Sequence, residues 1–578
     1  MTSILREHQG KLLLLFVLLG FFLRFHHIDK FGLAGDEKYS LFVSQFTSYQ
    51  GNNQKDSVRK PDSPYFTAKE FWSKKGISGF YDAIARVDTG NGAFFTYLLH
   101  FWTLWFGVSD TSLRMIPLIF SLLMVPLIYV FAKKHVKVEG VAIISAGLAA
   151  ISPFYISYAQ VARNYALLFF FALLSTHFFL EFLKSQGGWK KWYFVILYGV
   201  TAAICEMNHL STFPLFFIHF AFLLVYYRSW SHFLGFCVAM AFPLTAIVLW
   251  LLSPGGAYLF DYVGNSVKVY TEMATTSPYE FLSLTSFKSV ALQIRHVFSA
   301  MIISIDGFYD GVPSKKAGLA GLILLLAGTV LFSKERVSWK WKWIGITLLS
   351  LVGVAITGFR SWFMPVFLIN TALTGYAWFS MRELADQEKR KIYVFLALLS
   401  LVPVFFLVLF AVQDGNTFRI ITRYAGYGYA FAIIWVVWAY AWLLENKPDW
   451  KPLIAVAVAL QIVQISSLVN KVYEDRQPRY FMDYAEPRTQ NPYPIIAAKI
   501  EEMAAPGDTV IYPSDQYVKT EDEAYYSVID AQMTNFYLPK DNVVYQRVDP
   551  NERNKVILKS PDGSETELFD FKGSKYRY

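Results

Sequence analysis

The chain has 578 residues, of which 54% are hydrophobic and 17% are charged, and its formal net charge is +9. A composition this apolar, with repeated apolar runs of bilayer-spanning length, excludes an ordinary soluble protein and predicts a polytopic helical membrane protein. The two cysteines, Cys205 and Cys237, both lie in apolar runs, which argues against a disulfide framework.

The positive charge does not indicate nucleic acid as a partner. From Asn470 to Tyr578 the chain is slightly acidic, with 14 Lys and Arg against 19 Asp and Glu, so the basic excess lies in the apolar part. There it gathers in short loops between apolar runs, which is typical of the cytoplasmic side of a membrane protein.

The apolar runs come first in chain order. The first has no small-residue cleavage site after it, so it indicates a retained span rather than a signal peptide. The fourteen runs are 11–28, 94–108, 114–132, 139–156, 163–183, 191–207, 210–227, 233–252, 317–333, 343–358, 362–380, 391–411, 423–443 and 452–469.

Basic clusters such as Lys133–Lys137 should lie on the cytoplasmic side of the membrane. All of them can do so only if one of the early apolar runs does not cross the membrane. The run from Phe94 to Val108 is short for a crossing and rich in aromatic residues, which favours an interfacial helix. The sequence therefore predicts about 13 transmembrane helices, with the N-terminus cytoplasmic and the C-terminal segment outside.

This topology predicts two parts. Residues 1–469 form the transmembrane domain, with a first outer loop at 29–113, which contains the interfacial helix 94–108, and a second at 253–316. Residues 470–578 form a small soluble α/β domain. Within it YPIIAAKIEEMAA predicts a helix, PGDTVIYPSD a strand between turns, and NKVILKS and ETELFDF two further strands.

Ionisable and aromatic residues gather at the outer ends of the predicted spans. Charges next to hydrocarbon are costly, so a convergent set of them indicates a functional site. The candidates are Asp36, Glu37, Tyr39, Arg114, Gln160, Arg163, Asn164, Tyr165, His209, Arg360, Arg423 and Tyr424.

The two kinds of charge suit one reaction. A carboxylate takes a proton from an attacking hydroxyl, and a guanidinium holds a phosphate without losing its charge. Together they indicate glycosyl transfer from a polyprenyl-phosphate sugar, with Asp36 and Glu37 as the catalytic pair.

Each residue also has a structural interpretation. An Asp-Glu pair after a span is more often a helix cap, Arg114 and Arg360 are as easily interfacial anchors, and His209 more often packs than reacts. Tyr165 and Tyr424 are more often part of an aromatic belt. Arg163 is harder to explain this way, because it is the only cation between two long apolar runs on the outer side.

No other catalytic motif competes, since Walker A, HExxH, CxxC and GxSxG patterns are all missing from the sequence. The sequence indicates no cofactor with certainty. Asp36, Glu37 and His209 would be the ligands of a divalent metal, but they lack the short spacing of a metal motif, so the sequence supports one only weakly.

The order of these features resembles the GT-C superfamily of lipid-carrier glycosyltransferases, in the branch of the protein O-mannosyltransferases and aminoarabinose transferases (glycosyltransferase family 39-like). The resemblance rests on LAGDEKYSL, on GNGAFFTYLLHFWTLWFGVSDTSLRMIPLIF and on AAISPFYISYAQVARNYALL, which lie in the first third of the chain. The number of spans and the outer C-terminal domain are similar to the aminoarabinose transferases.

The resemblance implies roles for several residues. Asp36 would be the base or would position it, with Glu37 beside it, and Arg114 would serve function or local structure. The segment from Gln160 to Tyr165 would line the same cavity, although relatives place an acidic residue near the amide Asn164. Arg423 and Tyr424 would lie near the carrier phosphate.

One departure affects the donor site. Relatives commonly have a Pro-Pro pair, often after His or Lys, where this chain has Gly90-Asn91-Gly92-Ala93. Without a cation there, Arg360 or Arg423 would contact the donor phosphate, or the donor would sit differently.

The resemblance implies a membrane glycosyltransferase acting on the periplasmic side of a bacterial inner membrane. Its partners would be the bilayer, an undecaprenyl-phosphate-linked sugar and the hydroxyl of an acceptor lipid, polysaccharide or protein, with no nucleic acid. Two alternatives stay open from the residues: a transporter or flippase of lipid-linked saccharides, and a non-catalytic subunit of an envelope assembly.

Overall fold

The computed structural model consists mainly of helices. It describes residues 8–48, 66–73, 76–87, 93–185, 187–278, 282–302, 338, 341, 373–381, 384, 386–474, 489–513, 517–519, 524–526, 528–549 and 551–572. The long helices of the bundle are α2 (Gln9–Phe25), α7 (Asp110–Phe131), α8 (Val141–Ile151), α9 (Pro153–Ala159), α10 (Tyr165–Lys184), α11 (Gly188–Asn208), α12 (Phe213–Tyr226), α13 (Trp230–Leu251), α15 (Phe287–Ile302), α19 (Gln387–Asp414), α21 (Tyr429–Asn446) and α22 (Lys451–Tyr473).

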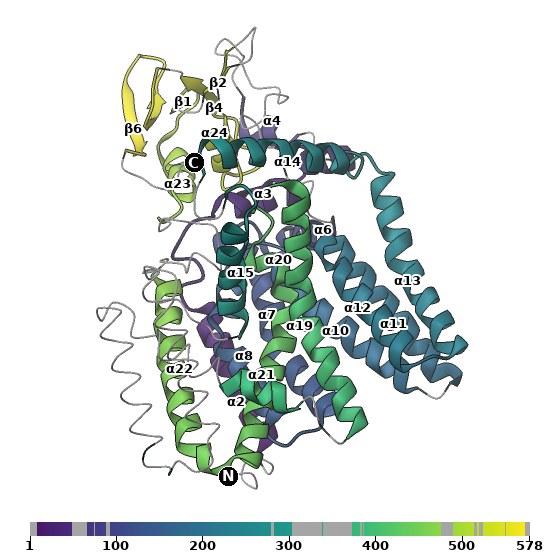
Figure 1. Cartoon of the computed structure of the whole chain (residues 1–578). Coiled ribbons are helices and arrows are strands. Elements are labelled where there is room, and N and C mark those ends of the chain that lie inside the picture. Colours follow the sequence, from purple (N-terminus) through teal and green to yellow (C-terminus); the bar gives the residue numbers. More distant parts are fainter. Residues whose placement is uncertain are drawn as a thin grey trace.

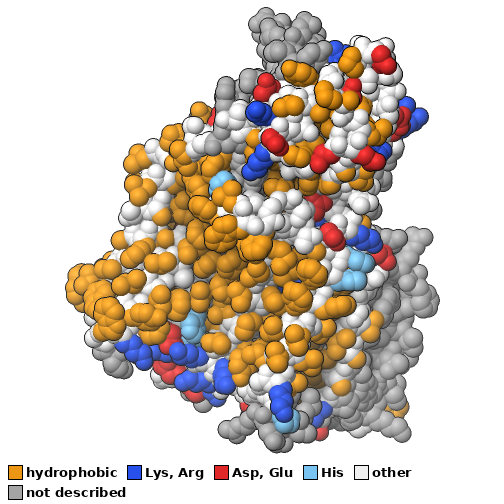
Figure 2. All heavy atoms as spheres, turned by 180° about the vertical axis from the view of Figure 1, so that it is seen from behind, with side chains coloured by type: hydrophobic (Ala, Val, Ile, Leu, Met, Phe, Trp, Pro, Cys, Tyr) orange, Lys and Arg blue, Asp and Glu red, His pale blue; other side chains and the backbone are white. Residues whose placement is uncertain are grey.

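Apolar length supports the predicted membrane protein. Among the described residues six helices are long and apolar enough to cross a membrane, or seven if the bent pair α8 and α9 is one span. Figure 2 shows hydrophobic side chains covering the middle of the molecule, with charged side chains mainly at its two ends. The count of 13 spans stays a prediction, because the runs 317–333 and 343–358 and most of 362–380 lie outside the described residues.

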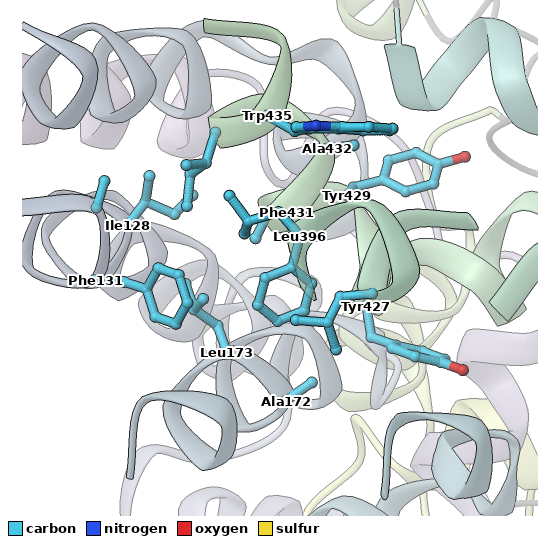
Figure 3. Close-up of a cluster of buried hydrophobic side chains, with 14 of the residues drawn as sticks. Ile128, Phe131, Ala172, Leu173, Leu396, Tyr427, Tyr429, Phe431, Ala432 and Trp435 are labelled. Atoms are coloured by element: carbon cyan, nitrogen blue, oxygen red, sulfur yellow. The ribbon is translucent and has the colours of Figure 1, made fainter. Parts of the chain in front are cut away.

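The bundle is held by large apolar side chains where α7, α10, α19 and α21 meet. Phe131 of α7, Leu173 of α10, Leu396 of α19 and Phe431 of α21 are all fully buried there (Figure 3). Because such interiors are close-packed, these four helices form a rigid support for the segments at their ends.

A buried arginine stabilises the bend in one predicted span. The chain turns by 52° between α8 and α9, where Pro153 begins the second helix. Arg24 of α2, which is fully buried, donates to the carbonyls of Ala150 (2.7 Å) and Ala149 (2.9 Å) at the end of α8. Its charge thus lies where a helix C-terminus leaves unpaired carbonyls.

Shorter elements lie at one end of the bundle. In the first predicted outer loop these are α3 (Gly35–Ser44), α4 (Ala68–Trp72), α5 (Ile77–Val87) and α6 (Ala93–Phe106). Helix α14 (Leu259–Thr276) lies across this end of the bundle (Figure 1). Helix α6 has 14 residues, too few to cross a bilayer, and its interfacial position remains a prediction.

The C-terminal elements follow the predicted order. The expected helix is α23 (Tyr493–Met503), and the expected strands are β1 (Thr509–Pro513), β5 (Lys555–Lys559) and β6 (Glu565–Asp570). With β4 (Tyr545–Asp549) they form a sheet of order β4-β1-β5-β6, in which only β1 and β4 are parallel. The sequence did not indicate β4, the pair β2 (Tyr517–Lys519) and β3 (Ala524–Tyr526), or α24 (Ile529–Asn535).

The C-terminal elements share a core with the first outer loop. Phe42 of α3, Leu99 of α6 and Leu113 of α7 belong to one buried cluster with Ile496 of α23 and Val510 of β1. The N–H of Gly32 also donates to the carbonyl of Thr489 (2.8 Å). The sheet therefore lies directly on the elements that carry the candidate site.

Candidate functional site

Helix α3 begins next to the Asp-Glu pair because Glu37 caps it. The Glu37 carboxylate accepts from the backbone N–H of Ala34 (2.8 Å), three residues earlier. A carboxylate in the first helical turn also faces the positive end of the helix dipole. Local sequence therefore determines where the helix starts.

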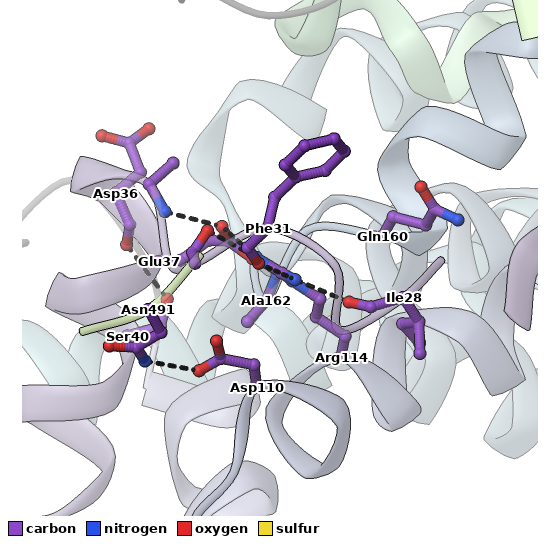
Figure 4. Close-up of polar contacts among 12 residues, drawn as sticks. Ile28, Phe31, Asp36, Glu37, Ser40, Asp110, Arg114, Gln160, Ala162 and Asn491 are labelled. Carbon is purple, nitrogen blue, oxygen red and sulfur yellow. Dashed lines mark hydrogen bonds and ion pairs between the residues drawn. The ribbon is translucent and has the colours of Figure 1, made fainter. Parts of the chain in front are cut away.

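Glu37 and Arg114 form a fully buried ion pair. Arg114 donates from Nε to Oε1 (2.8 Å) and from Nη2 to Oε2 (3.0 Å) of Glu37, a two-point contact between charged groups. The same guanidinium donates to the carbonyls of Ile28 (2.6 Å), Phe31 (2.8 Å) and Gly32 (3.0 Å). Arg114 thus ties the chain between α2 and α3 to α7 (Figure 4).

A third segment joins through the same carboxylate. The backbone N–H of Ala162, in the connection between α9 and α10, donates to Glu37 Oε1 (2.8 Å). Glu37 is therefore surrounded by donors and is 0% exposed. Its contacts give it a role in holding three segments together.

Asp36 points the other way. Figure 4 shows its carboxylate turned away from the Glu37 and Arg114 pair. Its side chain is 30% exposed and lies 3.4 Å from Nη1 of Arg423, which is carried by the short helix α20 (Thr422–Ala425). Of the two carboxylates, only that of Asp36 is accessible to a substrate hydroxyl.

Two guanidinium groups meet at Asp36. Arg163 donates from Nη1 to the backbone carbonyl of Asp36 (3.1 Å) and to Ser40 Oγ (3.4 Å). Arg423 lies 5.6 Å from the ring centre of Tyr165 and 5.5 Å from that of Tyr424. Two cations thus lie beside a residue that carries one carboxylate, and this excess of positive charge suits a phosphate.

His209 lies beside the same aromatic side chains. Its ring centre is 5.0 Å from that of Tyr424 and 6.3 Å from that of Tyr165. Burial, with the positive charges of Arg163 and Arg423, lowers the pKa of His209 to about 3. Nδ1 accepts from the N–H of Ser211 (3.1 Å), so the neutral ring carries its proton on Nε2 and offers a donor there.

The remaining candidates mostly hold the scaffold. Gln160 donates to the carbonyls of His26 (2.8 Å) and Arg24 (3.2 Å), and Asn164 donates to the carbonyl of Asn208. Tyr39 packs at the edge of the core shared with the C-terminal elements. Arg360 lies outside the described residues.

The sequence analysis missed several supporting residues. Ser40 contacts Arg163, and Asn491 (2.9 Å) and Tyr537 (3.1 Å) donate to Asp110 at the start of α7. No motif marks these contacts, because they join segments hundreds of residues apart. Ser40 lies four residues after Asp36, and this spacing, which places two side chains on one face of a helix, is the only sequence signal for these contacts.

A metal centre gains no support from this geometry. The side chains of Asp36 and Glu37 diverge, and the acceptor atoms of Glu37 are used by Arg114, Ala34 and Ala162. Within the described ranges, no three His, Cys, Asp or Glu side chains group as ligands.

Residues 91–253 match the family model described as dolichyl-phosphate-mannose-protein mannosyltransferase. This match covers less than a third of the chain, and over that range it agrees with the expected resemblance to the protein O-mannosyltransferases. The matched range contains Arg114, Arg163 and His209, whereas Asp36 and Arg423 lie outside it. No curated protein matches the chain in sequence.

Two solved membrane enzymes are weakly similar in structure. The oligosaccharyltransferase AglB of Archaeoglobus fulgidus, solved with an inhibitory peptide and a dolichol-phosphate, has 13% identity and a TM-score of 0.43 over 87% of this chain. The match covers only 59% of AglB. ArnT of Cupriavidus metallidurans has 12% identity and a TM-score of 0.37 over 93% of this chain and 86% of its own. Likenesses this weak carry no conclusion about function.

Proposed function

We propose that the protein is a membrane glycosyltransferase that moves a sugar from undecaprenyl phosphate, or a similar polyprenyl phosphate, to an acceptor hydroxyl. The observation that carries the proposal is a part-exposed carboxylate, that of Asp36, which lies against Arg423 while Arg163 donates to the backbone carbonyl of the same residue, at one end of an apolar helical bundle. The family match over 91–253 supports the reaction class.

In the proposed reaction Asp36 acts as the general base. Its carboxylate takes the proton of the acceptor hydroxyl while the oxygen attacks the anomeric carbon of the sugar, and the bond from that carbon to the phosphate oxygen breaks. The bonding electrons leave with the polyprenyl phosphate. Arg163 and Arg423 stabilise the negative charge that grows on this leaving group.

Glu37 has a positioning role in this proposal rather than a catalytic one. Its oxygens are committed to Arg114, Ala34 and Ala162, and it is buried. The neutral ring of His209 would donate a hydrogen bond from Nε2 to the substrate. The acceptor would carry the hydroxyl on a lipid, polysaccharide or protein, and the site would face the periplasm of a bacterial inner membrane.

The test measures transfer by the purified full chain in nanodiscs. A panel of radiolabelled undecaprenyl-phosphate sugars is incubated with membrane extract, and the label leaving the carrier is followed. We expect one donor to be used and Asp36→Asn to lower the rate by about 10²-fold or more, the usual contribution of a general base.

The matched control is Asp562→Asn, which makes the same change in the exposed turn between β5 and β6 and should keep the wild-type rate. Release of no label from any donor by the wild type would contradict the proposed function. Equal rates for Asp36→Asn and Asp562→Asn would contradict the assignment of the base.

A further inference from the structure

Arg423 has two tasks that compete. In the structure its Nη1 lies 3.4 Å from Oδ2 of Asp36. In the proposed reaction the same guanidinium holds the donor phosphate while Asp36 takes a proton. A carboxylate that is paired with a guanidinium is a poor base, so the pair and the reaction are incompatible.

The contact between these two side chains is easily exchanged. At 3.4 Å the pair is longer than a charge-assisted hydrogen bond, and the Asp36 side chain is 30% exposed. Arg423 belongs to a helix of only four residues, and its side chain is 12% exposed. A phosphate, which offers several acceptor oxygens to the planar guanidinium, would compete well for it.

Arg163 is held differently. Its Nη1 donates to the backbone carbonyl of Asp36 and to Ser40 Oγ, not to the Asp36 carboxylate. These contacts persist whether or not the carboxylate is paired. Arg163 therefore keeps Asp36 in place while Arg423 changes partner.

We propose that the phosphate of the polyprenyl donor takes Arg423 away from Asp36, so that Asp36 becomes available as the base only after the donor has bound. This inference rests on the proposed function and adds an order to it: donor first, then activation of the acceptor hydroxyl. Without a donor, Asp36 stays paired and does not activate water or an acceptor.

The test is the affinity for undecaprenyl phosphate of the full chain in nanodiscs. If Asp36 competes with the phosphate, Asp36→Asn should bind this lipid about fivefold more tightly, the upper range for a part-exposed ion pair. Asp36→Ala should shift the affinity in the same direction, because it removes the same charge. Arg423→Gln should bind more weakly than the wild type.

A double variant tests whether the effect passes through Arg423. With Arg423→Gln already present, adding Asp36→Asn should no longer tighten binding. The charge control is Asp414→Asn, which removes a carboxylate paired with Arg419 rather than with Arg423 and should leave the affinity unchanged. Undecaprenol, which lacks the phosphate, should bind the wild type and Asp36→Asn equally.

The outcomes separate this inference from the proposed function. Unchanged or weaker binding by Asp36→Asn and Asp36→Ala, in a preparation whose wild type transfers label, would overturn the exchange and leave the transferase intact. Equal tightening by Asp414→Asn would overturn it too, because a general charge effect would then suffice. A wild type that neither binds undecaprenyl phosphate nor releases label would instead refute the proposed function.

Discussion

The adjacent residues Asp36 and Glu37 lie in different surroundings. Asp36 and Glu37 are one residue apart at the start of α3, where successive side chains point in directions about 100° apart. Glu37 points into the protein and meets Arg114, whereas Asp36 points toward Arg423. Burial thus divides the pair into a positioning residue and a candidate base.

Glu37→Gln should destabilise the protein strongly. Removing one partner of a buried ion pair leaves the other charge uncompensated, which costs about 3–5 kcal/mol. We expect a clear fall in the thermal unfolding temperature in detergent. The control is Glu567→Gln, whose partner Lys555 is about half exposed, and which should leave the unfolding temperature almost unchanged because exposed ion pairs contribute little.

A catalytic role for Glu37 would give a different result for the same variant. If Glu37→Gln unfolded at the same temperature as Glu567→Gln but lost transfer activity, Glu37 would be catalytic and not a positioning residue.

At the scale of elements, aromatic rings support the short helix α20. Gly426 follows α20 directly, and a Cβ atom added there would lie 2.5 Å from the Phe169 ring and 2.7 Å from the Phe154 ring. Both rings are buried and stacked on each other. The backbone that follows Arg423 is therefore packed closely against these two rings.

Gly426→Ala should displace α20. Overpacking against rigid rings costs about 1–3 kcal/mol, and the shift should also weaken binding of undecaprenyl phosphate. Both are measured on the purified variant, by thermal unfolding and by the binding assay. Gly375→Ala is the control, since nothing lies within 4 Å of an added Cβ there. Wild-type affinity in Gly426→Ala would show that α20 does not position the donor site.

At the scale of the whole molecule, the C-terminal elements form part of the candidate site's support. The C-terminal elements share a buried core with the first outer loop, and two hydrogen bonds add to it. Gln532 donates to the carbonyl of Ser48 (3.0 Å), and Trp72 donates to the carbonyl of Asn535 (3.0 Å). Both contacts join the C-terminal part to segments that follow α3. The predicted division at residue 470 is thus crossed by much of the packing that holds Asp36.

A chain that ends at residue 474 should lose stability and donor binding. It keeps every described candidate site residue but exposes the apolar side chains of Phe42, Leu99 and Leu113, which the C-terminal elements cover. Thermal unfolding and undecaprenyl phosphate binding measure the two effects. An independent soluble domain predicts the opposite, namely a truncated chain that binds the lipid normally.

A cleavage control separates loss of contacts from loss of chain connection. A protease site introduced between residues 475 and 488 is cut after the protein has folded. We expect the two pieces to elute together and to bind the lipid as the intact chain does.

Local patterns in the sequence determined much of this protein. Apolar runs predicted α7, α10, α13, α19, α21 and α22, which are long and apolar enough to cross a membrane, and alternation and turn residues predicted β1, β5 and β6. These predictions succeed because bilayer thickness and side-chain period act on neighbouring residues. The candidate residues were found for a similar reason, because the order of residues alone shows that a charge lies next to an apolar run.

Only the tertiary structure decided which candidates meet. Glu37 meets Arg114 across 77 positions, and Asp36 meets Arg423 across several hundred positions of the sequence, so neither pairing leaves a local signal. The direction of a side chain at a helix start depends on what packs around it. Two further candidates, Gln160 and Asn164, bind backbone carbonyls in the structure. The sequence alone determined which charges lie near the apolar runs. Long-range packing decided that Glu37 is buried and that the Asp36 carboxylate stays part-exposed, because burial depends on segments far apart in the chain.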